Sequence, residues 1–275
     1  MRISGRTRIT GIFGFPIEHT LSPAMHNAAF EALGLDYCYV PFLVPPDLLG
    51  DAVRSIRALG IAGVNVTVPH KEKVMLLLDE VDEEASFIGA VNTIVNAGGR
   101  LKGHNTDGRG FMQSLAEKGI SVKGASVLII GAGGAARAVG YYLCGKAGGV
   151  FIHGRTKDKV ERLVRDLGKI RSNAELVEDL SGIGRFDLVI NATPLGLKDS
   201  DPMPLSADLL TKGQIVCDLI YRETALLREA SKKGCVTVNG LGMLLWQGVE
   251  AFQLWTGKRP DVEVMRQALT GAINQ

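Results

Sequence analysis

Short apolar runs alternate with helical stretches between Ala125 and Asn239, and this alternation constrains the fold most strongly. The runs are rich in β-branched residues and lack strict apolar-polar alternation, which is typical of parallel strands covered on both faces. They read SVLII, VFIH, FDLVINAT, QIVCDLI and CVTVN, with a charged helix expected from about Lys157 to Leu167. Strands that alternate with helices in this way predict an α/β domain with a parallel sheet.

A glycine-rich turn follows the first of these runs. The segment Gly131-Ala132-Gly133-Gly134-Ala135-Ala136 joins SVLII to a small-residue helix, which is the context that the G-x-G-x-x-G/A motif requires. Gly131 allows the tight turn, Gly133 lets the backbone approach a pyrophosphate, and Ala136 keeps helix and strand close. Free N–H groups at the helix start suit phosphates, so the turn predicts a dinucleotide site. A tight turn without a ligand is the alternative.

A basic segment follows the second run. It reads His153-Gly154-Arg155-Thr156, with Lys159 in the next helical turn. NAD enzymes usually present an acid to the adenosine ribose at this point, whereas this chain presents a guanidinium, a hydroxyl and an ammonium. These groups suit the 2′-phosphate of NADP, so we predict NADP rather than NAD. A solvated start of a basic helix is the alternative.

The segments before and after the parallel region differ in length. About 108 residues with their own strands and helices precede it, and about 35 residues follow. This tail is too short to fold alone, and its pattern predicts helices from Met243 to Thr256 and from Val262 to Ile273. We therefore expect two α/β domains, residues 1–108 and a Rossmann-type domain of residues 109–240. Residues 241–275 should form C-terminal helices that pack back on the first domain.

Two polar segments mark a second candidate site. In AGVNVTVPHK, Asn65 and Thr67 share one face of an expected strand and valines share the other. On this segment alone, a strand between core and solvent is the simpler interpretation. Ser22 and Pro23 open a helix, with Ser22 expected as the N-cap and Pro23 as the first helical residue. Hydroxyl groups at a helix N-terminus also suit a substrate carboxylate.

Asn92 and Asp107 flank an expected hairpin that turns at residues 96–99. Asp107 could simply cap the helix that starts near Gly108. His26, His70, His104 and His153 are isolated and lack metal-ligand spacing, and we assign none of them a catalytic role.

Composition excludes several classes of function. Lys plus Arg total 31 against 29 Asp plus Glu, which leaves a net charge of +2 and no concentrated charge run. This balance gives no reason to expect nucleic acid or an anionic membrane as a partner. The four cysteines are far apart and form no Cys-x-x-Cys pair, so we expect reduced, mostly buried thiols and no metal. The N-terminus lacks the apolar run of a signal peptide, and we expect a cytoplasmic protein.

Together these segments resemble the shikimate dehydrogenase family, and the resemblance runs in family order over almost the whole chain. The matching motifs are GFPIEHTLSPAMHN, GVNVTVPHK, GAVNTI, HNTDG, GAGGAARA, GRT, NATPLG, DLIY and GLGMLLWQG. The resemblance implies a substrate-binding domain, an NADP-binding Rossmann domain and the reversible oxidation of shikimate to 3-dehydroshikimate. It also implies a small-molecule substrate. Whether the protein is a monomer or a homodimer remains open.

The resemblance also implies roles for individual residues. The family's catalytic pair falls on Lys71, as acid/base, and Asp107, as its orienting partner. Its carboxylate-binding hydroxyls fall on Thr20 and Ser22. The other substrate-binding positions fall on Asn65, Thr67, Asn92, Tyr221 and Gln247. Its cofactor-binding positions fall on Gly131, Ala132, Gly133, Gly134, Ala135, Arg155, Thr156, Lys159, Leu219 and Gly240, of which Leu219 and Gly240 lie on the nicotinamide side.

Two positions depart from the family pattern. Thr20 stands where a serine is usual, and Gly154 stands where an asparagine is frequent before the Arg-Thr pair. These departures concern substrate breadth and cofactor affinity rather than the reaction class.

Three other functions are alternatives. A quinate/shikimate dehydrogenase would use broader substrates and sometimes NAD, which Arg155 disfavours. A methyltransferase can carry a similar turn but normally has an acid after the second strand. A regulator that senses nucleotides would have no need of Lys71 and Asp107.

Overall fold

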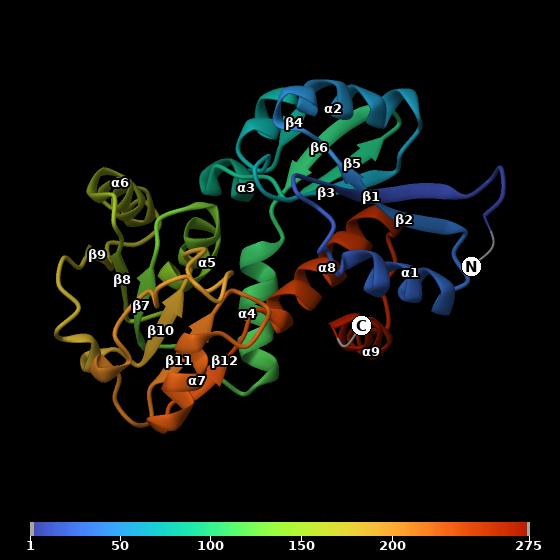
Figure 1. Ribbon diagram of the computed structural model, residues 1–275. Helices are drawn as coiled ribbons and strands as arrows, with labels where there is room; N and C mark the ends of the chain where they lie inside the picture. The colour runs from blue at the N-terminus through green and yellow to red at the C-terminus, as the bar shows by residue number, and fades with distance from the viewer. Residues whose placement is uncertain (1–2, 274–275) are drawn as a thin grey trace. The chain divides into compact units, whose positions relative to one another are not determined.

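The computed structural model describes residues 3–273, which form two compact units. The first unit comprises residues up to Thr106 together with the chain from Leu245 onward, and the second comprises Asp107–Leu244. Each unit is built on its own six-stranded sheet (Figure 1). Two α/β units, with a C-terminal segment that returns to the first, confirm the fold class expected from the sequence.

The first unit contains a mixed sheet with the strand order β2-β1-β3-β5-β6-β4. The strands β1, β2 and β3 are parallel, whereas β5 runs antiparallel to both β3 and β6. The elements are β1 (Arg8–Gly14), α1 (Ser22–Ala32), β2 (Tyr37–Leu43), α2 (Leu49–Ala58), β3 (Gly63–Val66), β4 (Glu80–Val81), α3 (Glu83–Ile88), β5 (Thr93–Ala97), β6 (Arg100–His104) and α9 (Val262–Ile273).

Helices cover both faces of this sheet: α2 lies on one face, and α1, α9 and the end of α8 lie on the other (Figure 1). The valine face of β3 packs into the core beneath α2, where Val64 and Val66 are at most 1% exposed. On the opposite face, the indole N–H of Trp255 in α8 donates to the carbonyl oxygen of Ile94 at 3.0 Å. The sheet is therefore a central layer rather than a surface layer.

The second unit contains a fully parallel sheet with the order β12-β11-β10-β7-β8-β9. Its elements are α4 (Asp107–Glu117), β7 (Ser126–Ile130), α5 (Gly134–Cys144), β8 (Gly149–His153), α6 (Lys157–Gly168), β9 (Ala174–Leu176), β10 (Leu188–Asn191), β11 (Ile215–Asp218), α7 (Ala225–Lys232) and β12 (Val236–Val238). Each apolar run named above contains one of these strands, so the predicted parallel sheet is confirmed. The strand order reverses between β7 and β10, which is where doubly wound sheets bind ligands.

The long helix α8 (Leu241–Thr256) crosses the unit boundary at residues 244 and 245, and it ends before Gly257, whose φ is +68°. The sequence-based boundaries fall at residues 108/109 and 240/241. Asp261 accepts hydrogen bonds from the N–H groups of Glu263 and Val264 at 2.9 and 3.3 Å and so opens α9. The last helix therefore begins where its sequence pattern predicts.

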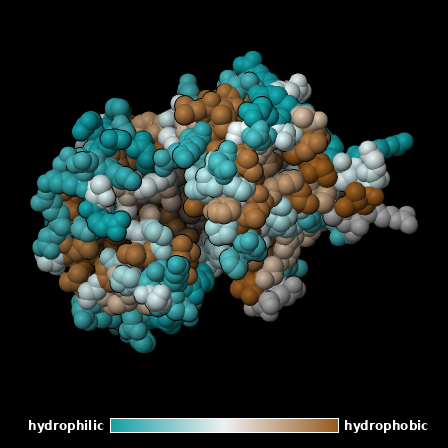
Figure 2. Space-filling view, turned by 45° about the horizontal axis from the view of Figure 1, so that its top comes forward, coloured by the Kyte–Doolittle hydropathy of each residue, from teal (hydrophilic) through white to brown (hydrophobic). Residues whose placement is uncertain are grey.

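Polar residues cover much of the molecular face shown in Figure 2, and hydrophobic residues reach that face in separate patches. All four cysteines are free and buried. No helix within residues 3–273 is long and apolar enough to cross a membrane.

Candidate active site

The glycine-rich turn has a backbone that only glycine tolerates at its first position. Gly131 has a φ of +120°, and a Cβ atom there would lie 2.9 Å from the carbonyl oxygen of Ala192. Its N–H donates to the carbonyl oxygen of His153 at 2.7 Å, which joins the ends of β7 and β8. The turn is therefore held tightly at the carboxyl edge of the parallel sheet.

The other side of this turn is open. Among residues 3–273, no heavy atom outside Gly133 and its two chain neighbours lies within 4 Å of the position that a Cβ on Gly133 would occupy, and Gly133 directly precedes the first residue of α5. The neighbouring residues Ala132, Gly134 and Ala135 are partly exposed, whereas Ala136 is fully buried against the strand. The start of α5 thus presents its N–H groups to an open space of the kind that a pyrophosphate fills.

The basic segment at the end of β8 is exposed. Arg155, Thr156 and Lys159 all reach solvent, and within residues 3–273 neither Arg155 nor Lys159 has an ion-pair partner. Lys157, by contrast, pairs with Glu178 at 2.6 Å. A hollow of about 140 Å³ lies beside the segment between β8, β9 and α6. The hollow is lined by the paired Lys157 and Glu178 rather than by Arg155 or Lys159. The two exposed cations that lack an ion-pair partner in the described part of the chain are groups that suit a phosphate.

The structure corrects the expectation that Ser22 caps α1. Leu21 occupies the N-cap position with no side-chain hydrogen bond, and Ser22 is itself the first helical residue. Ser22 is 3% exposed and hydrogen-bonds through its side chain to the hydroxyl of Tyr39. The hydroxyl of Thr20 instead accepts the Ser22 N–H at 3.4 Å. The two hydroxyls therefore lie at the helix start as expected, but Ser22 bonds to a strand rather than to its own helix.

The expectation of a solvent-facing side on β3 is wrong. Asn65 is 4% exposed, because α1 and the end of α8 cover the face on which it lies. Its amide nitrogen donates to the Asn92 carbonyl oxygen and to the Thr93 hydroxyl, both at 3.1 Å. Its amide oxygen accepts the Tyr39 hydroxyl at 2.8 Å. Asn65 is thus brought together with Asn92, and through Tyr39 with Ser22.

Lys71 follows β3 in a short turn and is partly buried. The carbonyl oxygen of Lys71 accepts the Val91 N–H at 2.8 Å, which fixes the backbone beside the following segment. Its neighbour His70 is 1% exposed, and its Nε2 atom lies 2.7 Å from the Val44 carbonyl oxygen. Thr67 lies just past the end of β3 and is partly buried. His70 therefore has a structural role, whereas Lys71 is a partly buried basic residue beyond the end of β3.

The hairpin between β5 and β6 is confirmed, with Gly98 and Gly99 at positive φ in its turn. Beyond β6, Asn92 holds the chain through Thr106: its amide oxygen accepts the Thr106 N–H, and its amide nitrogen donates to the Thr106 hydroxyl, each at 2.9 Å. Asp107 comes next, 7% exposed, as the first residue of α4. A buried polar row therefore runs up to the residue that precedes Asp107.

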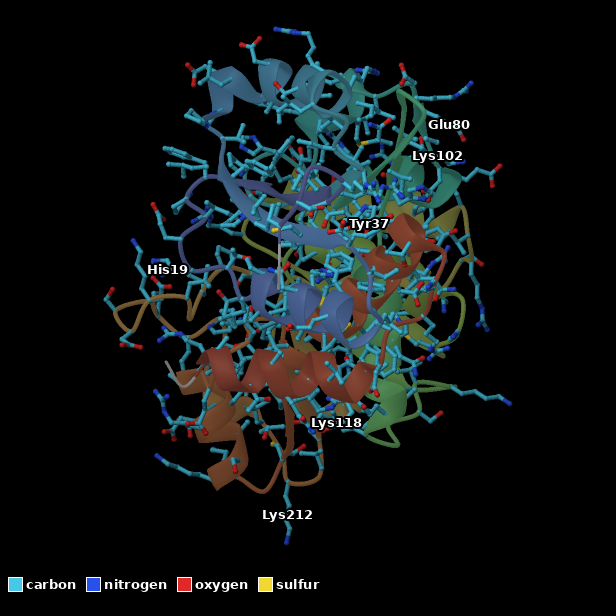
Figure 3. All side chains as sticks on the ribbon, turned by 90° about the vertical axis from the view of Figure 1, so that its right-hand side faces the viewer. His19, Tyr37, Glu80, Lys102, Lys118 and Lys212 are labelled. Carbon is cyan, nitrogen blue, oxygen red and sulfur yellow. The ribbon has the colours of Figure 1, made fainter. Side chains whose placement is uncertain are left out.

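The remaining predicted residues lie on three other segments. Gln247 is 8% exposed on α8, and Tyr221 is 37% exposed after β11. Gly240 packs so closely on the peptide after Leu219 that a Cβ atom would lie 2.1 Å from the Leu219 carbonyl oxygen. His19 is exposed on the loop before α1 (Figure 3). Within residues 3–273, no group of His, Cys, Asp or Glu side chains could hold a metal ion.

Sequence reasoning missed two groups of polar residues. Tyr39 lies in the apolar run of β2 and was indistinguishable there from a core aromatic residue, yet its hydroxyl joins Ser22 to Asn65. Asn191 and Asp218 end neighbouring strands and bond to each other at 3.0 Å. A polar residue at the end of each apolar run was the available signal for this second pair.

Family models match three stretches of the chain. Residues 12–94 match the model described as shikimate dehydrogenase substrate binding domain, and residues 114–196 match shikimate / quinate 5-dehydrogenase. Residues 240–270 match the model described as shikimate 5'-dehydrogenase C-terminal domain.

Curated relatives match nearly the whole length of the chain. A shikimate dehydrogenase (NADP(+)) of Desulforamulus reducens is 49% identical over 280 residues, covering 98% of this chain and 96% of the relative. A protein of the same name from Carboxydothermus hydrogenoformans is 46% identical, with 98% and 99% covered.

Solved structures are similarly close. The shikimate 5-dehydrogenase of Thermus thermophilus, in complex with NADP(H) and shikimate, has a TM-score of 0.89 and 40% identity, with 97% of this chain and 100% of that chain covered. The quinate dehydrogenase of Corynebacterium glutamicum, in complex with NAD, has a TM-score of 0.88 and 34% identity, with 96% and 99% covered.

Proposed function

Since the chain belongs to the shikimate dehydrogenase family, we propose that it catalyses the NADP-dependent, reversible oxidation of shikimate to 3-dehydroshikimate. The observation that carries the proposal is near full-length identity of 46 to 49% to two relatives named for this reaction with NADP. The reaction is a step in the biosynthesis of aromatic amino acids. The protein is accordingly an oxidoreductase that acts on a CH–OH group.

The cofactor assignment is supported by the residues at the carboxyl edge of the second sheet. Gly131 and the open side of Gly133 leave room for a pyrophosphate at the start of α5. Arg155, Thr156 and Lys159 offer two cations and a hydroxyl to the 2′-phosphate, and no acid replaces them there. When bound, NADP supplies the hydride chemistry at C4 of its nicotinamide.

The chain's own residues have to move the proton. We assign Lys71 as the acid/base at the oxygen of the shikimate 3-hydroxyl, because an ammonium can give a proton to a developing alkoxide and an amine can take one from an alcohol. We assign Asp107 as its orienting partner, since a carboxylate favours the charged form of the lysine. The partial burial of Lys71 supports this role.

Substrate binding is assigned to the hydroxyls and amides of the first unit. Thr20 and Ser22 at the start of α1 suit the substrate carboxylate. Thr67, Asn92 and Gln247 suit the substrate hydroxyls, with Asn65 close by. Tyr221, which belongs to the second unit, is assigned as a further substrate-binding residue. Every amide hydrogen of Asn65 is bonded within the protein, so Asn65 has only acceptor capacity left for a ligand.

A two-by-two assay tests the proposal. Purified protein is supplied with shikimate or quinate, and with NADP or NAD, while the absorbance of the reduced nicotinamide is followed. We expect turnover with shikimate and NADP to exceed the other three combinations. Equal or greater turnover with quinate and NAD would instead assign the protein to the quinate dehydrogenase function of its Corynebacterium glutamicum relative.

We further propose a cytoplasmic location, which the four free, buried cysteines support. The assembly is proposed to be a monomer or a homodimer, and light scattering on the purified protein distinguishes the two.

A further inference from the structure

A buried carboxylate ties three segments together at the carboxyl edge of the second sheet. Asp218 ends β11 and is 1% exposed. One carboxylate oxygen accepts the amide of Asn191 at 3.0 Å and the N–H of Ile220 at 3.1 Å. The other oxygen accepts the hydroxyl of Thr224 at 2.8 Å. Asp218 therefore links the end of β10, the turn after β11 and the N-cap of α7.

Neutral donors alone surround this carboxylate in the described part of the chain. Within residues 3–273, no lysine, arginine or histidine lies within ion-pair distance of Asp218. Burial raises the pKa of the carboxyl group, and the bonds from Thr224, Ile220 and Asn191 oppose that rise. A buried acid without a counter-ion is costly, and three donors that converge on it offset part of that cost. The group is therefore arranged to bind dipoles rather than a charge.

Two backbone hydrogen bonds also hold the segment after Asp218. The N–H of Leu219 donates to the carbonyl oxygen of Asn191 at 3.0 Å, and the N–H of Gly240 donates to the carbonyl oxygen of Ile220 at 2.9 Å. Gly240 also lies against the Leu219 carbonyl, where no side chain would fit. The turn from Leu219 to Tyr221 is thus fixed on both sides.

The position of this turn indicates which part of the cofactor it meets. A doubly wound sheet binds a dinucleotide across the point where the strand order reverses, with one nucleotide on each half. Here the glycine-rich turn after β7 and the basic segment after β8 belong to the adenosine half. Asn191 and Asp218 end β10 and β11, on the other side of the reversal. The Leu219–Tyr221 turn therefore belongs to the nicotinamide half.

We propose that Asp218 is a positioning residue, which holds the Leu219–Tyr221 turn in the shape that binds the nicotinamide half of NADP. The proposal rests on the proposed function and deepens its cofactor site. Asp218 acts through its hydrogen bonds rather than its charge. An amide at this position keeps one oxygen for Asn191 and Ile220, and its nitrogen donates to the Thr224 oxygen, which is able to accept. An alanine removes all three bonds.

The experiment compares the whole cofactor with its adenosine half. The unmodified protein, Asp218→Asn and Asp218→Ala are titrated by calorimetry with NADP+ and with 2′,5′-ADP, which carries the 2′-phosphate but no nicotinamide. We expect Asp218→Ala to weaken NADP+ binding about tenfold or more, since buried donors lose their acceptor, and to change 2′,5′-ADP binding by less than about twofold. Asp218→Asn should keep NADP+ affinity within about threefold.

A matched control lies at the opposite edge of the same sheet. Asp187 accepts the N–H and the hydroxyl of Ser126 at 2.8 and 2.9 Å, so it also ties segments together, but at the amino ends of the strands. Asp187→Ala should leave the affinities for both ligands unchanged. Thr224→Val removes one donor from Asp218, together with the bond by which Thr224 caps α7, and keeps the side-chain shape, so it tests the proposal even if Asp218→Ala does not fold. It should weaken NADP+ binding a few-fold and leave 2′,5′-ADP binding as it is.

Several outcomes would overturn the proposal. Unchanged NADP+ affinity in a folded Asp218→Ala variant would remove Asp218 from the cofactor site. Equal weakening of NADP+ and 2′,5′-ADP binding would mean that the whole unit is perturbed. A loss in Asp218→Asn as large as in Asp218→Ala would mean that the charge matters. The titrations need no shikimate, so failure of the proposed reaction would appear separately as absent turnover in the unmodified protein.

Discussion

The hydroxyl of Tyr39 donates a 2.8 Å hydrogen bond to the amide oxygen of Asn65. Because Asn65 uses its amide hydrogens for Asn92 and Thr93, its oxygen has to accept, and the single hydrogen of Tyr39 is committed to it. Tyr39 can then only accept from Ser22. The donor and acceptor roles along this row are therefore determined by the bonds at its Asn65 end.

Removing this hydroxyl should destabilise the protein. Tyr39→Phe leaves the buried Asn65 oxygen without its donor, and we expect a loss of about 1–3 kcal/mol in the free energy of unfolding. The matched control is Tyr37→Phe, two residues earlier on β2 (Figure 3), whose hydroxyl contacts the exposed Arg8 instead. The free energies of unfolding of both variants are measured in urea. Equal losses in Tyr39→Phe and Tyr37→Phe would mean that the buried Tyr39 hydrogen bond contributes no more than the Tyr37 hydroxyl does.

Acid should destabilise the protein through His26. This ring is fully buried, stacked 4.4 Å from Tyr39, and burial lowers its pKa to about 3. An unfolded chain binds this proton below pH about 6.5, whereas the folded one binds it only near pH 3. The contribution of neutral His26 to the free energy of unfolding is therefore complete above pH 6.5. It falls by about 1.4 kcal/mol per pH unit between pH 6.5 and about 3.

The variant His26→Phe should remove this dependence. We expect its free energy of unfolding to fall less steeply between about pH 6.5 and 4.5 than that of the unmodified protein, by the equivalent of about one proton. His19→Gln changes an exposed histidine and should leave the original profile in place. Parallel profiles for His26→Phe and the unmodified protein would show that His26 does not titrate differently on unfolding.

The catalytic assignment predicts a selective loss of turnover. Lys71→Ala should lower kcat by about 10² to 10⁴-fold, the usual contribution of a general acid/base, and change KM only a few-fold. Lys71→Arg should not restore kcat, because a guanidinium does not readily give up its proton. Asp107→Asn should lower kcat less. Lys73→Ala, two residues along and exposed, is the control. Near-normal kcat in Lys71→Ala would assign the proton transfer to another group.

Cofactor preference should depend on the basic segment after β8. Two charge-assisted hydrogen bonds to the 2′-phosphate suffice for a preference of about a hundredfold for NADP over NAD. Arg155→Asp should abolish or reverse it, measured as the ratio of kcat/KM for the two cofactors. Arg162→Asp makes the same charge change on the exposed face of α6 and should leave the ratio unaltered. The assignment fails if the unmodified protein uses both cofactors equally well.

Shikimate binding should depend on the hydroxyl at the start of α1. Ser22→Ala is expected to raise KM for shikimate more than it lowers kcat, because a binding group is lost rather than a catalytic one. Since Ser22 does not cap the helix, no capping loss accompanies the change, although its bond to Tyr39 disappears. Kinetics and thermal melting are measured on the same sample. An unchanged KM in a folded variant would exclude Ser22 from the site.

Features that depend on neighbouring residues could be predicted from the amino-acid sequence. The parallel strands, the glycine at positive φ in the turn after β7, and the start of α9 each follow from local pattern and backbone sterics. The family motifs likewise identify most of the candidate site, because each motif is a continuous segment.

The burial and the bonding of the polar residues, by contrast, depend on tertiary packing. Asn65 looked half-exposed and Ser22 looked like a cap, but helices distant in sequence cover the first, and Tyr39 of β2 binds the second. Asp218 meets Asn191 only because β10 and β11 are neighbours in the sheet. A polar group's cost or benefit depends on which partners reach it when water is excluded, and those partners come from segments that no local pattern connects.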